Sequence, residues 1–478
     1  MNITNCESLI PAVPFTPPKD SVNTISTLEV STIASNPGTR TKLHSYPPPV
    51  LRSSAFKVKV DGKELEVLNH PGADFASFEC DGPVEIQIEH DGDQPGLFIR
   101  PLNRDITPKV ADGVVCFTIP SPQYLQIEFE GLPLLYLYAL APAGEPPSGK
   151  HVRRFAGGKI HEAGEILLGD GDVCWIDAGA IVRGTIRAAN ATGVRVGGYG
   201  ILDGSYWLTR KALGKALVLD HCQNSRIETL LMLGPSNWMI SIGACEGITV
   251  VGVRQIAINS SSDGVDIAGS KNIAIKGCCL HNGDDNIAIK AVQNVAGWDE
   301  SLRIEYRLGD WEGPVENVVI SDCMLYNLNG GSAMEIGYET RTERISNIHF
   351  ENIDVLGVHC FGSVFGIHNG DRALVENILW ENIRVEHHYD RLVDFRITKS
   401  RWNRDKERGL VRNVTLRNIQ VSQSEHNAGY TLSMLVGCDA AHPVSGIYFE
   451  NFKLGGVRVL SADQLDLVTR NADNITFK

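Results

Sequence analysis

Short segments in which apolar and polar residues alternate follow one another along the chain, and no long amphipathic helical segment interrupts them. Between residues 56 and 143 they include FKVKV, VEIQIEH and VVCFTI, separated by Gly, Asp and Pro. This alternation is typical of half-buried strands, and its spacing predicts a β-sandwich, which we place at residues 51–146. Residues 1–50 are rich in Pro, Ser and Thr and predict an extended N-terminal arm.

The pattern changes after the PAGEPPSGK segment to a recurring phrase, in which a small or polar residue, often Asn, precedes a β-branched residue and alternation follows. The β-branched anchors of this phrase are Val194, Ile227, Ile248, Ile273, Val318, Ile348, Ile378, Val414 and Ile447. A constant phrase with variable spacing predicts coils of similar strands joined by loops of different length. We therefore expect an all-β chain, with a right-handed parallel β-helix over residues 147–478. A second β-sandwich is the weaker alternative, because the phrase gives no sign of antiparallel hairpins.

Composition and charge narrow the classes of partner. The 478-residue chain is 43% hydrophobic, lacks a continuous apolar run of membrane-spanning length and carries a net charge of −13. We therefore expect no membrane and no nucleic-acid partner. The eleven cysteines predict reduced, buried thiols, and without paired CxxC elements we expect no metal and no cofactor. The first residues lack the features of a secretory signal, which predicts a cytoplasmic protein unless a signal has been removed; the oligomeric state stays open.

Three aspartates come together when successive coils are aligned. Residues 259–290 contain DGVDI and DDNIAI, which repeat at the interval of one coil. Alignment of these segments places Asp263 on Asp285 and leaves Asp284 beside them. Parallel strands lie roughly 4.8 Å apart, and like charges at that distance raise at least one pKa. The three carboxylates therefore form our candidate catalytic site.

This arrangement suits inverting glycoside hydrolysis. One carboxylic acid protonates the leaving oxygen while other carboxylates activate water. Asp284 has the opposite strand parity from the other two, so we expect its carboxyl group to project sideways toward a glycosidic oxygen. Sideways projection would also help to reach the usual separation of about 6.5–9.5 Å in inverting enzymes. The alternative is a Ca²⁺ site or a solvated turn, because both favour clustered Asp side chains.

Several motifs resemble the polygalacturonase family, glycoside hydrolase family 28, and its β-helical relatives, the dextranases and isopullulanases of family 49. They are GGYGILDGSYW at 197–207, GPSNW at 234–238, SSDGVD at 261–266, NGDDNIAIK at 282–290 and GGSAMEIGYE at 330–339. The resemblance covers roughly residues 150–455. It implies a pectin-lyase-like β-helix and an inverting mechanism with Asp284 as general acid and Asp263 with Asp285 as the base pair. A β-sandwich ahead of the helix resembles the dextranase-like branch.

The chain departs from the polygalacturonase pattern at the positions that bind substrate. Ser332 replaces the catalytic-site His, and Gly366 and His368 stand where the Arg-x-Lys pair should hold the galacturonate carboxylate. An anionic sugar needs charge-assisted donors there, so we expect a neutral sugar. Arg396 and Lys399, one coil later, are either a relocated positive site or solvated charges.

Other residues are weaker candidates for substrate binding. For each of them a structural role is the alternative. They are Trp238 as a sugar-stacking platform, His281, Lys290 as an ion-pair partner of the acids, Ser332, Tyr338, Glu339, His368 and Arg396. The insertion at 291–313 follows the acids and predicts a wall at one end of the cleft.

The leading hypothesis is an inverting, metal-independent glycoside hydrolase acting on a neutral polysaccharide or oligosaccharide, with a dextran-like α-glucan as first guess. A polygalacturonase-type hydrolase is the second hypothesis. A Ca²⁺-dependent lyase or a non-catalytic carbohydrate-binding β-helix is the third.

Overall fold

The chain folds into two compact units, which we describe separately. The computed structural model describes residues 41–90, 96–111, 113–210, 214–292, 296–299, 304–307, 310–327, 330–358, 362–422 and 432–478. One unit ends at Pro146, and the other begins at Pro147. The described residues contain no α-helix and hence no helix with the length and apolar character needed to cross a membrane.

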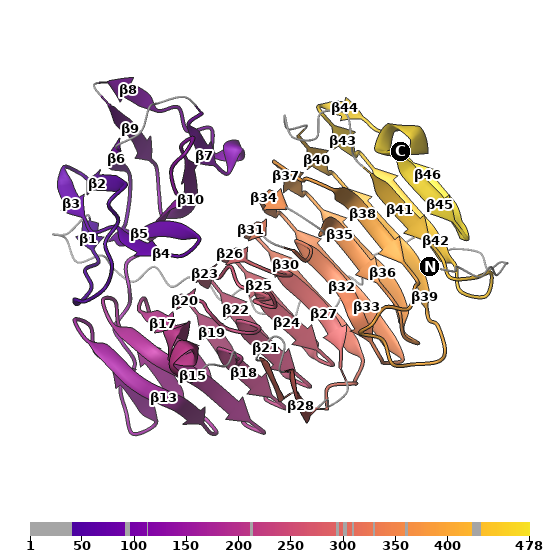
Figure 1. The fold of residues 1–478 in the computed structure, drawn as a ribbon, viewed down its shortest axis with the longest axis horizontal. Helices are drawn as coiled ribbons and strands as arrows, with labels where there is room; N and C mark the ends of the chain where they lie inside the picture. Colours follow the sequence, from indigo (N-terminus) through magenta and orange to yellow (C-terminus); the bar gives the residue numbers. More distant parts are fainter. Residues whose placement is uncertain are drawn as a thin grey trace. The chain divides into compact units, whose positions relative to one another are not determined.

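The first unit is the expected β-sandwich (Figure 1). One sheet has β1 (Thr41–Leu43), β4 (Leu68–His70), β5 (Ala73–Cys80), β11 (Leu135–Leu140), β10 (Gln123–Glu128) and β7 (Phe98–Arg100). The other has β3 (Lys63–Leu65), β2 (Phe56–Val60), β6 (Val84–His90), β9 (Val114–Ile119) and β8 (Lys109–Ala111). Strand β1 lies in the range expected to be an extended arm, yet it pairs with β5. The rest of that arm, residues 1–40, lies outside the described residues.

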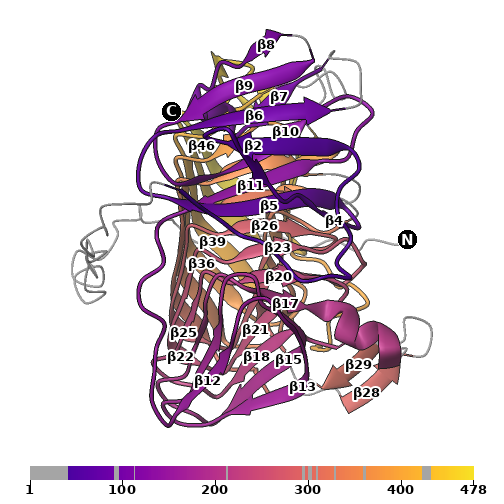
Figure 2. The same cartoon turned by 90° about the vertical axis from the view of Figure 1, so that its left-hand side faces the viewer.

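The second unit is the expected right-handed parallel β-helix, whose coils stack along one axis (Figures 1 and 2). Its twelve-stranded sheet contains β12 (Val152–Phe155), β14 (Val173–Ile176), β16 (Arg195–Gly197), β19 (Arg226–Glu228), β22 (Glu246–Val251), β25 (Lys271–Lys276), β30 (Val315–Ser321), β33 (Arg344–Glu351), β36 (Leu374–Glu381), β39 (Leu410–Arg417), β42 (Val444–Glu450) and β46 (Ala472–Phe477). One strand per coil enters this sheet, so the repeated phrase of the sequence becomes a continuous ladder.

The remaining strands of each coil form a larger sheet, which carries the candidate site. It contains β13 (Ile160–Leu168), β15 (Ile181–Ala189), β17 (Ile201–Asp203), β18 (Leu217–Asp220), β20 (Leu231–Leu233), β21 (Ile240–Gly243), β23 (Arg254–Ile256), β24 (Val265–Ala268), β26 (Cys279–Asn282), β27 (Ile287–Ala291), β31 (Met324–Asn327), β32 (Met334–Thr340), β34 (Asp354–Val358), β35 (Ser363–His368), β37 (Arg384–Val385), β38 (Arg391–Arg396), β40 (Gln420–Val421), β41 (Ser433–Val436), β43 (Lys453–Leu454), β44 (Val457–Arg458) and β45 (Leu467–Arg470). Stacked aliphatic side chains fill the space between the sheets.

The repeat anchors pair as the sequence predicted from Ile248 onward. In the preceding coil the predicted pairing is wrong by two residues, because Ile227 pairs with Val250 and not with Ile248. Asn224, at φ 45°, occupies the corner position that Gly247 holds in the next coil. A displacement of two residues keeps the same side chains on the core face, so the hydrophobic pattern alone did not reveal it.

Left-handed corners explain why Asn recurs in the phrase. Five Asn residues that lie within the first four residues of β25, β30, β33, β36 and β39 have φ between 55° and 59°: Asn272, Asn317, Asn347, Asn377 and Asn413. Asn is among the few residues other than Gly that adopt this conformation readily. The side-chain amides of these residues also form a ladder from coil to coil, with 3.2 Å between Asn347 Nδ2 and Asn317 Oδ1.

Candidate active site

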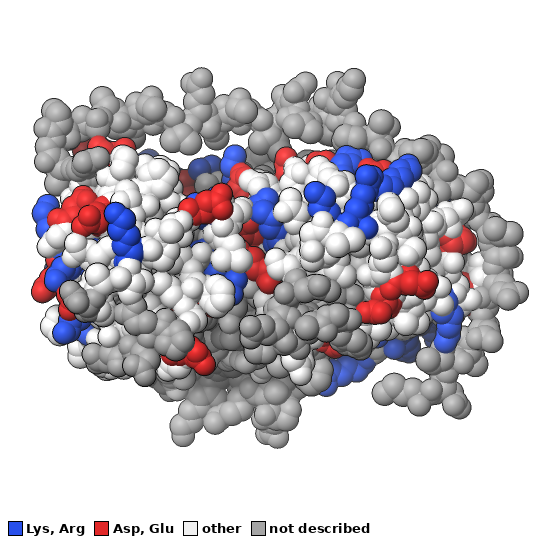
Figure 3. Space-filling view, turned by 90° about the horizontal axis from the view of Figure 1, so that it is seen from above, with Lys and Arg blue, Asp and Glu red and all other residues white. Residues whose placement is uncertain are grey.

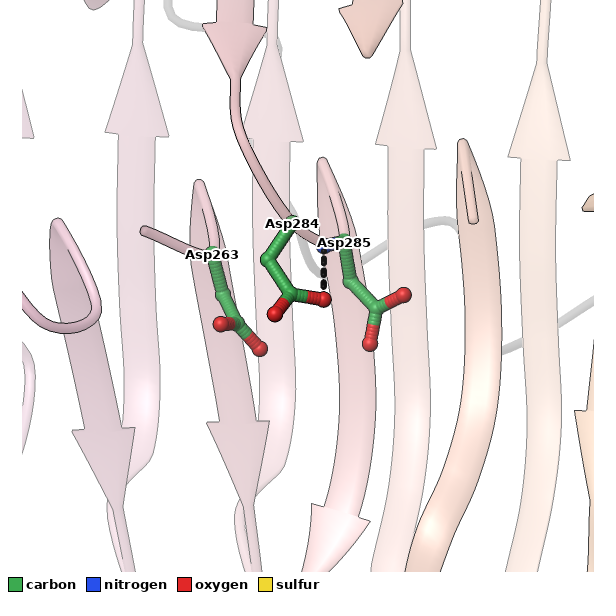
Figure 4. Close-up of side chains that lie close together, drawn as sticks. All are labelled: Asp263, Asp284 and Asp285. Atoms are coloured by element: carbon green, nitrogen blue, oxygen red, sulfur yellow. Dashed lines mark hydrogen bonds between the residues drawn. The ribbon is translucent and has the colours of Figure 1, made fainter. Parts of the chain in front are cut away.

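The register of β24 and β27 brings the three aspartates together. Val265 pairs with Ile287, as the alignment of the two motifs predicted. One carboxylate oxygen from each of Asp263, Asp284 and Asp285 lies within 4.8 Å of the others. Figure 4 shows the three side chains projecting from the strand starts toward the same space. Asp263 and Asp285 are buried and Asp284 is partly exposed, so Asp284 can be reached from solvent.

Backbone donors hold Asp284 in place. Its Oδ2 accepts a hydrogen bond from Ser261 N at 3.1 Å, and its Oδ1 accepts one from Asp285 N at 3.0 Å (Figure 4). Gly331 passes so close that a Cβ there would overlap both Asp284 and Asp285 N, and its φ of 75° also favours Gly. Burial, and then the charge of Asp263, raise the pKa of Asp284 to about 7 despite these donors.

Asp285 is more enclosed than Asp284. Ser332, the residue that replaces the expected His, donates its backbone N–H to Asp285 Oδ1 at 2.6 Å. The Ser332 hydroxyl is directed to Ser363 Oγ, 3.0 Å away on the next coil. Burial and the neighbouring charges of Asp284 and Asp263 raise the pKa of Asp285 well above its ordinary value.

Lys290 compensates the charge at the other side of the cluster. Its Nζ lies 2.8 Å from Asp263 Oδ2 and 2.9 Å from Asp266 Oδ1. Burial would lower the pKa of Lys290, but Asp263 and Asp266 raise it well above the ordinary value. Lys290 thus balances part of the negative charge of Asp263 and Asp266.

Aromatic side chains line the face next to Lys290. Trp238 is only 8% exposed, and its ring centroid lies 4.3 Å from Lys290 Nζ and 4.0 Å from Lys215 Nζ. It therefore offers little ring surface to a sugar. Trp311, from the expected insertion, packs in the same cluster, lies over Gly243 and donates Nε1 to Asp220 Oδ1 at 2.7 Å.

A second group of charged side chains lies on β32, β35 and β38. His368 Nδ1 is 2.7 Å from Glu335 Oε1, and its Nε2 is 3.3 Å from Asp394 Oδ2. Arg396 Nε contacts Asp394 Oδ1 at 2.5 Å, and the Tyr338 ring stacks on His368 with centroids 4.2 Å apart. The cations of this group are therefore already paired with carboxylates.

The charged forms of His368 and Asp394 stabilise each other. Burial works against the charged imidazolium, but Glu335 and Asp394 raise the pKa of His368 above its ordinary value. Burial also works against the Asp394 carboxylate, yet His368, Arg396 and Arg391 lower its pKa to about 2. Glu335 connects this group to the aspartates, because its charge contributes to the raised pKa of Asp285.

The structure separates the remaining predicted residues. Glu339 is partly exposed on β32. His281 is fully buried on β26, edge-on to Tyr326 with ring centroids 4.9 Å apart. Sequence reasoning missed Asp266, Glu335, Asp394, Lys215 and Trp311. Asp266 could have been predicted, because it lies between the core residues Val265 and Ile267 on the strand and its side chain must therefore point away from the core.

Residues 178–462 match the model of glycosyl hydrolases family 28, and the chain belongs to that family. It is 29% identical over 156 residues to a probable polygalacturonase of Arabidopsis thaliana, covering 30% of this chain and 34% of the relative. It is 22% identical over 263 residues to a polygalacturonase of Chamaecyparis obtusa, covering 54% and 45%. The chain thus spans less than half the length of these relatives.

The fold is also similar to that of Dex49A from Penicillium minioluteum. The two structures superpose with a TM-score of 0.64 and 13% identity, covering 92% of this chain and 97% of the other. This similarity confirms the fold that combines a β-sandwich with a β-helix.

Proposed function

We propose that the chain is a glycoside hydrolase that cleaves its substrate with inversion, using Asp284 as general acid. The observation that carries the proposal is the approach of three carboxylates within 4.8 Å, combined with the raised pKa of Asp284, about 7. A carboxyl group with such a pKa holds its proton near neutral pH and can donate it.

The reaction uses the three aspartates in two roles. As the bond between the anomeric carbon and the glycosidic oxygen breaks, Asp284 gives its proton to the leaving oxygen. A water molecule held by Asp263 and Asp285 attacks the anomeric carbon from the opposite face, and one of these carboxylates takes its proton. The separation of 4.8 Å or less is shorter than the usual range of about 6.5–9.5 Å in inverting enzymes, so the stereochemistry needs a direct test.

The sugar beside Asp285 is proposed to be neutral. The Glu335 carboxylate occupies the space where a Cβ at position 366 would lie. At the position where the polygalacturonase pattern has a cation, this chain therefore has Gly366 with an anion beside it. His368 and Arg396 are engaged by Glu335 and Asp394. A uronate carboxylate placed here would face acidic groups. A dextran-like α-glucan is our first candidate.

Hydrolysis of galacturonan is the second candidate, and it is at least as well supported. The relatives in the family are named polygalacturonases, and the guanidinium of Arg396 is partly exposed. The two candidates differ in the charge of the sugar at the scissile bond.

One experiment tests the reaction and the substrate together. Isomalto-oligosaccharides and oligogalacturonates are incubated with the protein, and proton NMR follows the anomer of the first product. Inverted product from either series supports the proposal, and the faster series identifies the substrate. Retained configuration would refute the inverting mechanism, and an unsaturated product or loss of activity in EDTA would favour a Ca²⁺-dependent lyase.

A further inference from the structure

The segment that leads into β24 contains a β-bulge. Trp238 N, in the preceding coil, donates a hydrogen bond to Ser261 O at 2.8 Å, and Met239 N donates one to Asp263 O at 2.7 Å. The two donors are consecutive but their acceptors are two residues apart, so Ser262 is the extra residue of this coil. A bulge re-aims the groups beside it, and this one lies immediately before Asp263.

The hydroxyl group of Ser262 holds the bulge in place. Ser262 is fully buried, and its hydroxyl donates to Asn259 O at 2.6 Å and accepts from Gly283 N at 3.0 Å. Asn259 Nδ2 in turn donates to Ser236 O at 2.6 Å, which ties the segment to the preceding coil. The bulge therefore has a defined conformation, because its buried polar groups are paired.

Two residues at the bulge adopt the left-handed conformation although neither is Gly, Asn or Asp. The φ angle is 63° at Ser261 and 45° at Trp238. A positive φ is uncommon for such residues, and for a bulky residue such as Trp it is strained. The Trp238 ring is buried against the ammonium groups of Lys215 and Lys290. Strain of this kind persists only where the surrounding contacts fix the backbone, and it is typical of functional sites.

The left-handed turn changes the partner of one backbone donor. At the start of β24 the N–H groups of this coil pair with backbone carbonyls of the next coil, as Gly264 N does with Asp285 O at 2.8 Å. Ser261 N instead donates to a side chain of the next coil, to Asp284 Oδ2 at 3.1 Å. The other oxygen, Asp284 Oδ1, accepts from Asp285 N. Each oxygen of the Asp284 carboxyl group therefore has its own backbone donor.

We propose that Ser261 is a positioning residue for the general acid: its left-handed backbone, fixed by Trp238 and by the bulge at Ser262, directs its N–H at the Asp284 carboxyl group. The inference rests on the proposed function for the role of Asp284 as acid. One donor on each oxygen fixes the plane of the carboxyl group, and a fixed plane aims the acidic proton at the leaving oxygen. The role belongs to the backbone of Ser261, so it depends on tolerance of a positive φ and not on the hydroxyl group.

The electrostatics around the carboxyl group agree with this geometry. Burial and then the charge of Asp263 raise the pKa of Asp284 to about 7. Lys290 and the N–H groups of Asp285 and Ser261 lower that pKa. Loss of the Ser261 donor should therefore raise the pKa of Asp284 further, whereas a change that only loosens packing elsewhere should leave it unaltered.

Substitutions at position 261 test the inference directly. Ser261→Gly and Ser261→Asn accept a positive φ, whereas Ser261→Val disfavours it because its side chain branches at Cβ. Asn190→Val is the matched control, since Asn190 is an exposed residue with φ 52° in another coil. None of these substitutions changes the charge of the protein, whose described basic and acidic side chains lie interspersed on the face shown in Figure 3. A shift in the pKa of Asp284 thus reports the backbone donor and not an altered field.

A second pair of variants leaves position 261 intact. Ser262→Ala removes the hydroxyl group that holds the bulge and adds no bulk, so it tests the same device if Ser261→Val fails to fold. Its control is Ser270→Ala, because the buried Ser270 hydroxyl also joins two backbone groups, accepting from Cys245 N at 2.9 Å and donating to Ile242 O at 3.0 Å. Both variants lose one buried hydroxyl, but only the first should release Ser261.

Carbon-13 NMR follows the titration of the Asp284 carboxyl group, whose signal is the one missing in Asp284→Asn, and steady-state kinetics gives kcat and KM across pH. Ser261→Val should raise the pKa of Asp284 and lower kcat about 10–100-fold, with a smaller change in KM. Ser262→Ala should shift both in the same direction by less. The Gly and Asn variants at position 261 should keep the parental pKa of Asp284, and the two controls should lose thermal stability without moving this pKa.

An unchanged titration of Asp284 in folded Ser261→Val and in Ser262→Ala would overturn the inference, as would an equal shift in the Gly and Asn variants or in the controls. Thermal unfolding shows which variants are folded. The expected titration shifts in a protein that hydrolyses no glycan would support the positioning of the carboxyl group and refute the proposed function alone.

Discussion

Asp284 and Asp285 are sequence neighbours, yet their surroundings differ. Asp284 is partly exposed, and burial together with Asp263 raises its pKa to about 7. Asp285 is buried, and burial together with the charges of Asp284 and Asp263 raises its pKa well above the ordinary value. Asp263 is paired with Lys290 at 2.8 Å. The three carboxylates therefore have different environments, which is the condition for separate acid and base roles.

Replacement of the general acid should remove turnover. Asp284→Asn keeps the shape of the side chain but has no proton to donate, so kcat should fall by about 10²–10⁴-fold. Activity of the parent should decline as pH rises through about 7, where Asp284 loses its proton, and the residual activity of the variant should lack this decline. Steady-state kinetics across pH check both points, with the exposed Asp81→Asn as control. Near-normal kcat in Asp284→Asn would exclude it as the acid.

The same substitution should stabilise the fold in a pH-dependent way. Between about pH 4 and 7 an unfolded chain has lost the proton of this residue, whereas folded Asp284, with its pKa raised to about 7, still holds it. Stability of the parent therefore falls as pH rises through this window. Asp284→Asn should raise the free energy of unfolding by about 2–4 kcal/mol at pH 7 and by much less at pH 4. Thermal unfolding at both values measures the difference, and an equal effect at both would contradict it.

Lys290 is expected to support two buried carboxylates at once. Lys290→Met would leave Asp263 and Asp266 uncompensated and should cost about 3–5 kcal/mol of stability. Adding Asp266→Asn to this variant should recover part of the loss, because one buried charge is removed. Activity should stay low, because Asp263 still lacks its ion pair. Denaturant unfolding of the two single variants and the double variant gives the coupling, and strictly additive effects would argue against the bridge.

The three catalytic candidates followed from the sequence because their positions repeat at one coil. Asp394 and Glu335 could not be predicted in this way, because they approach His368 from strands that are separated by loops of different length. Register also shifts between Ile289 and Ala291, where β27 meets β32. Contacts that depend on such a shift are not encoded in a short motif.

At the level of the element, the strands of the twelve-stranded sheet from β14 to β46 have a residue with positive φ just before them or within their first four residues. The sequence revealed the coils because Asn or Gly must recur where φ is positive. It did not give the exact pairing of the early coils, since a shift of two residues leaves the core face unchanged. Loops of variable length between the strands carry no such repeated constraint.

The Asn ladder contributes to stability in two ways that can be measured separately: through the left-handed backbone conformation of each Asn and through the hydrogen bonds between the side chains. Asn347, at φ 57°, donates to Asn317 and accepts from Asn377. Asn347→Gly should keep the left-handed corner and lose only the ladder, at a cost of about 0.5–1.5 kcal/mol. Asn347→Ala should cost about 1–2 kcal/mol more, because Cβ disfavours this conformation. Denaturant unfolding compares the two, and equal stability would show that the corner imposes no backbone constraint.

At the level of the whole molecule, the two units contain separate hydrophobic cores. The β-sandwich buries side chains between its own two sheets, and the β-helix buries a continuous stack of aliphatic residues. The segment between them, residues 141–150, has no strand and is largely exposed. The domain boundary at residues 146–147 stays a prediction from composition, where a Pro- and Gly-rich segment separates two different hydrophobic patterns.

Limited proteolysis should therefore cut first within residues 141–150 and leave two folded pieces. Each unit has its own core, so its contacts do not depend on an intact peptide bond between the units. Mass spectrometry identifies the cut, and calorimetry of the cleaved sample should retain the main thermal transition of the β-helix. Loss of that transition upon cleavage would show that the helix needs a covalent connection to the sandwich. Retention would allow the hydrolysis experiments to be repeated on the β-helix alone, which would test whether the three aspartates act without the β-sandwich.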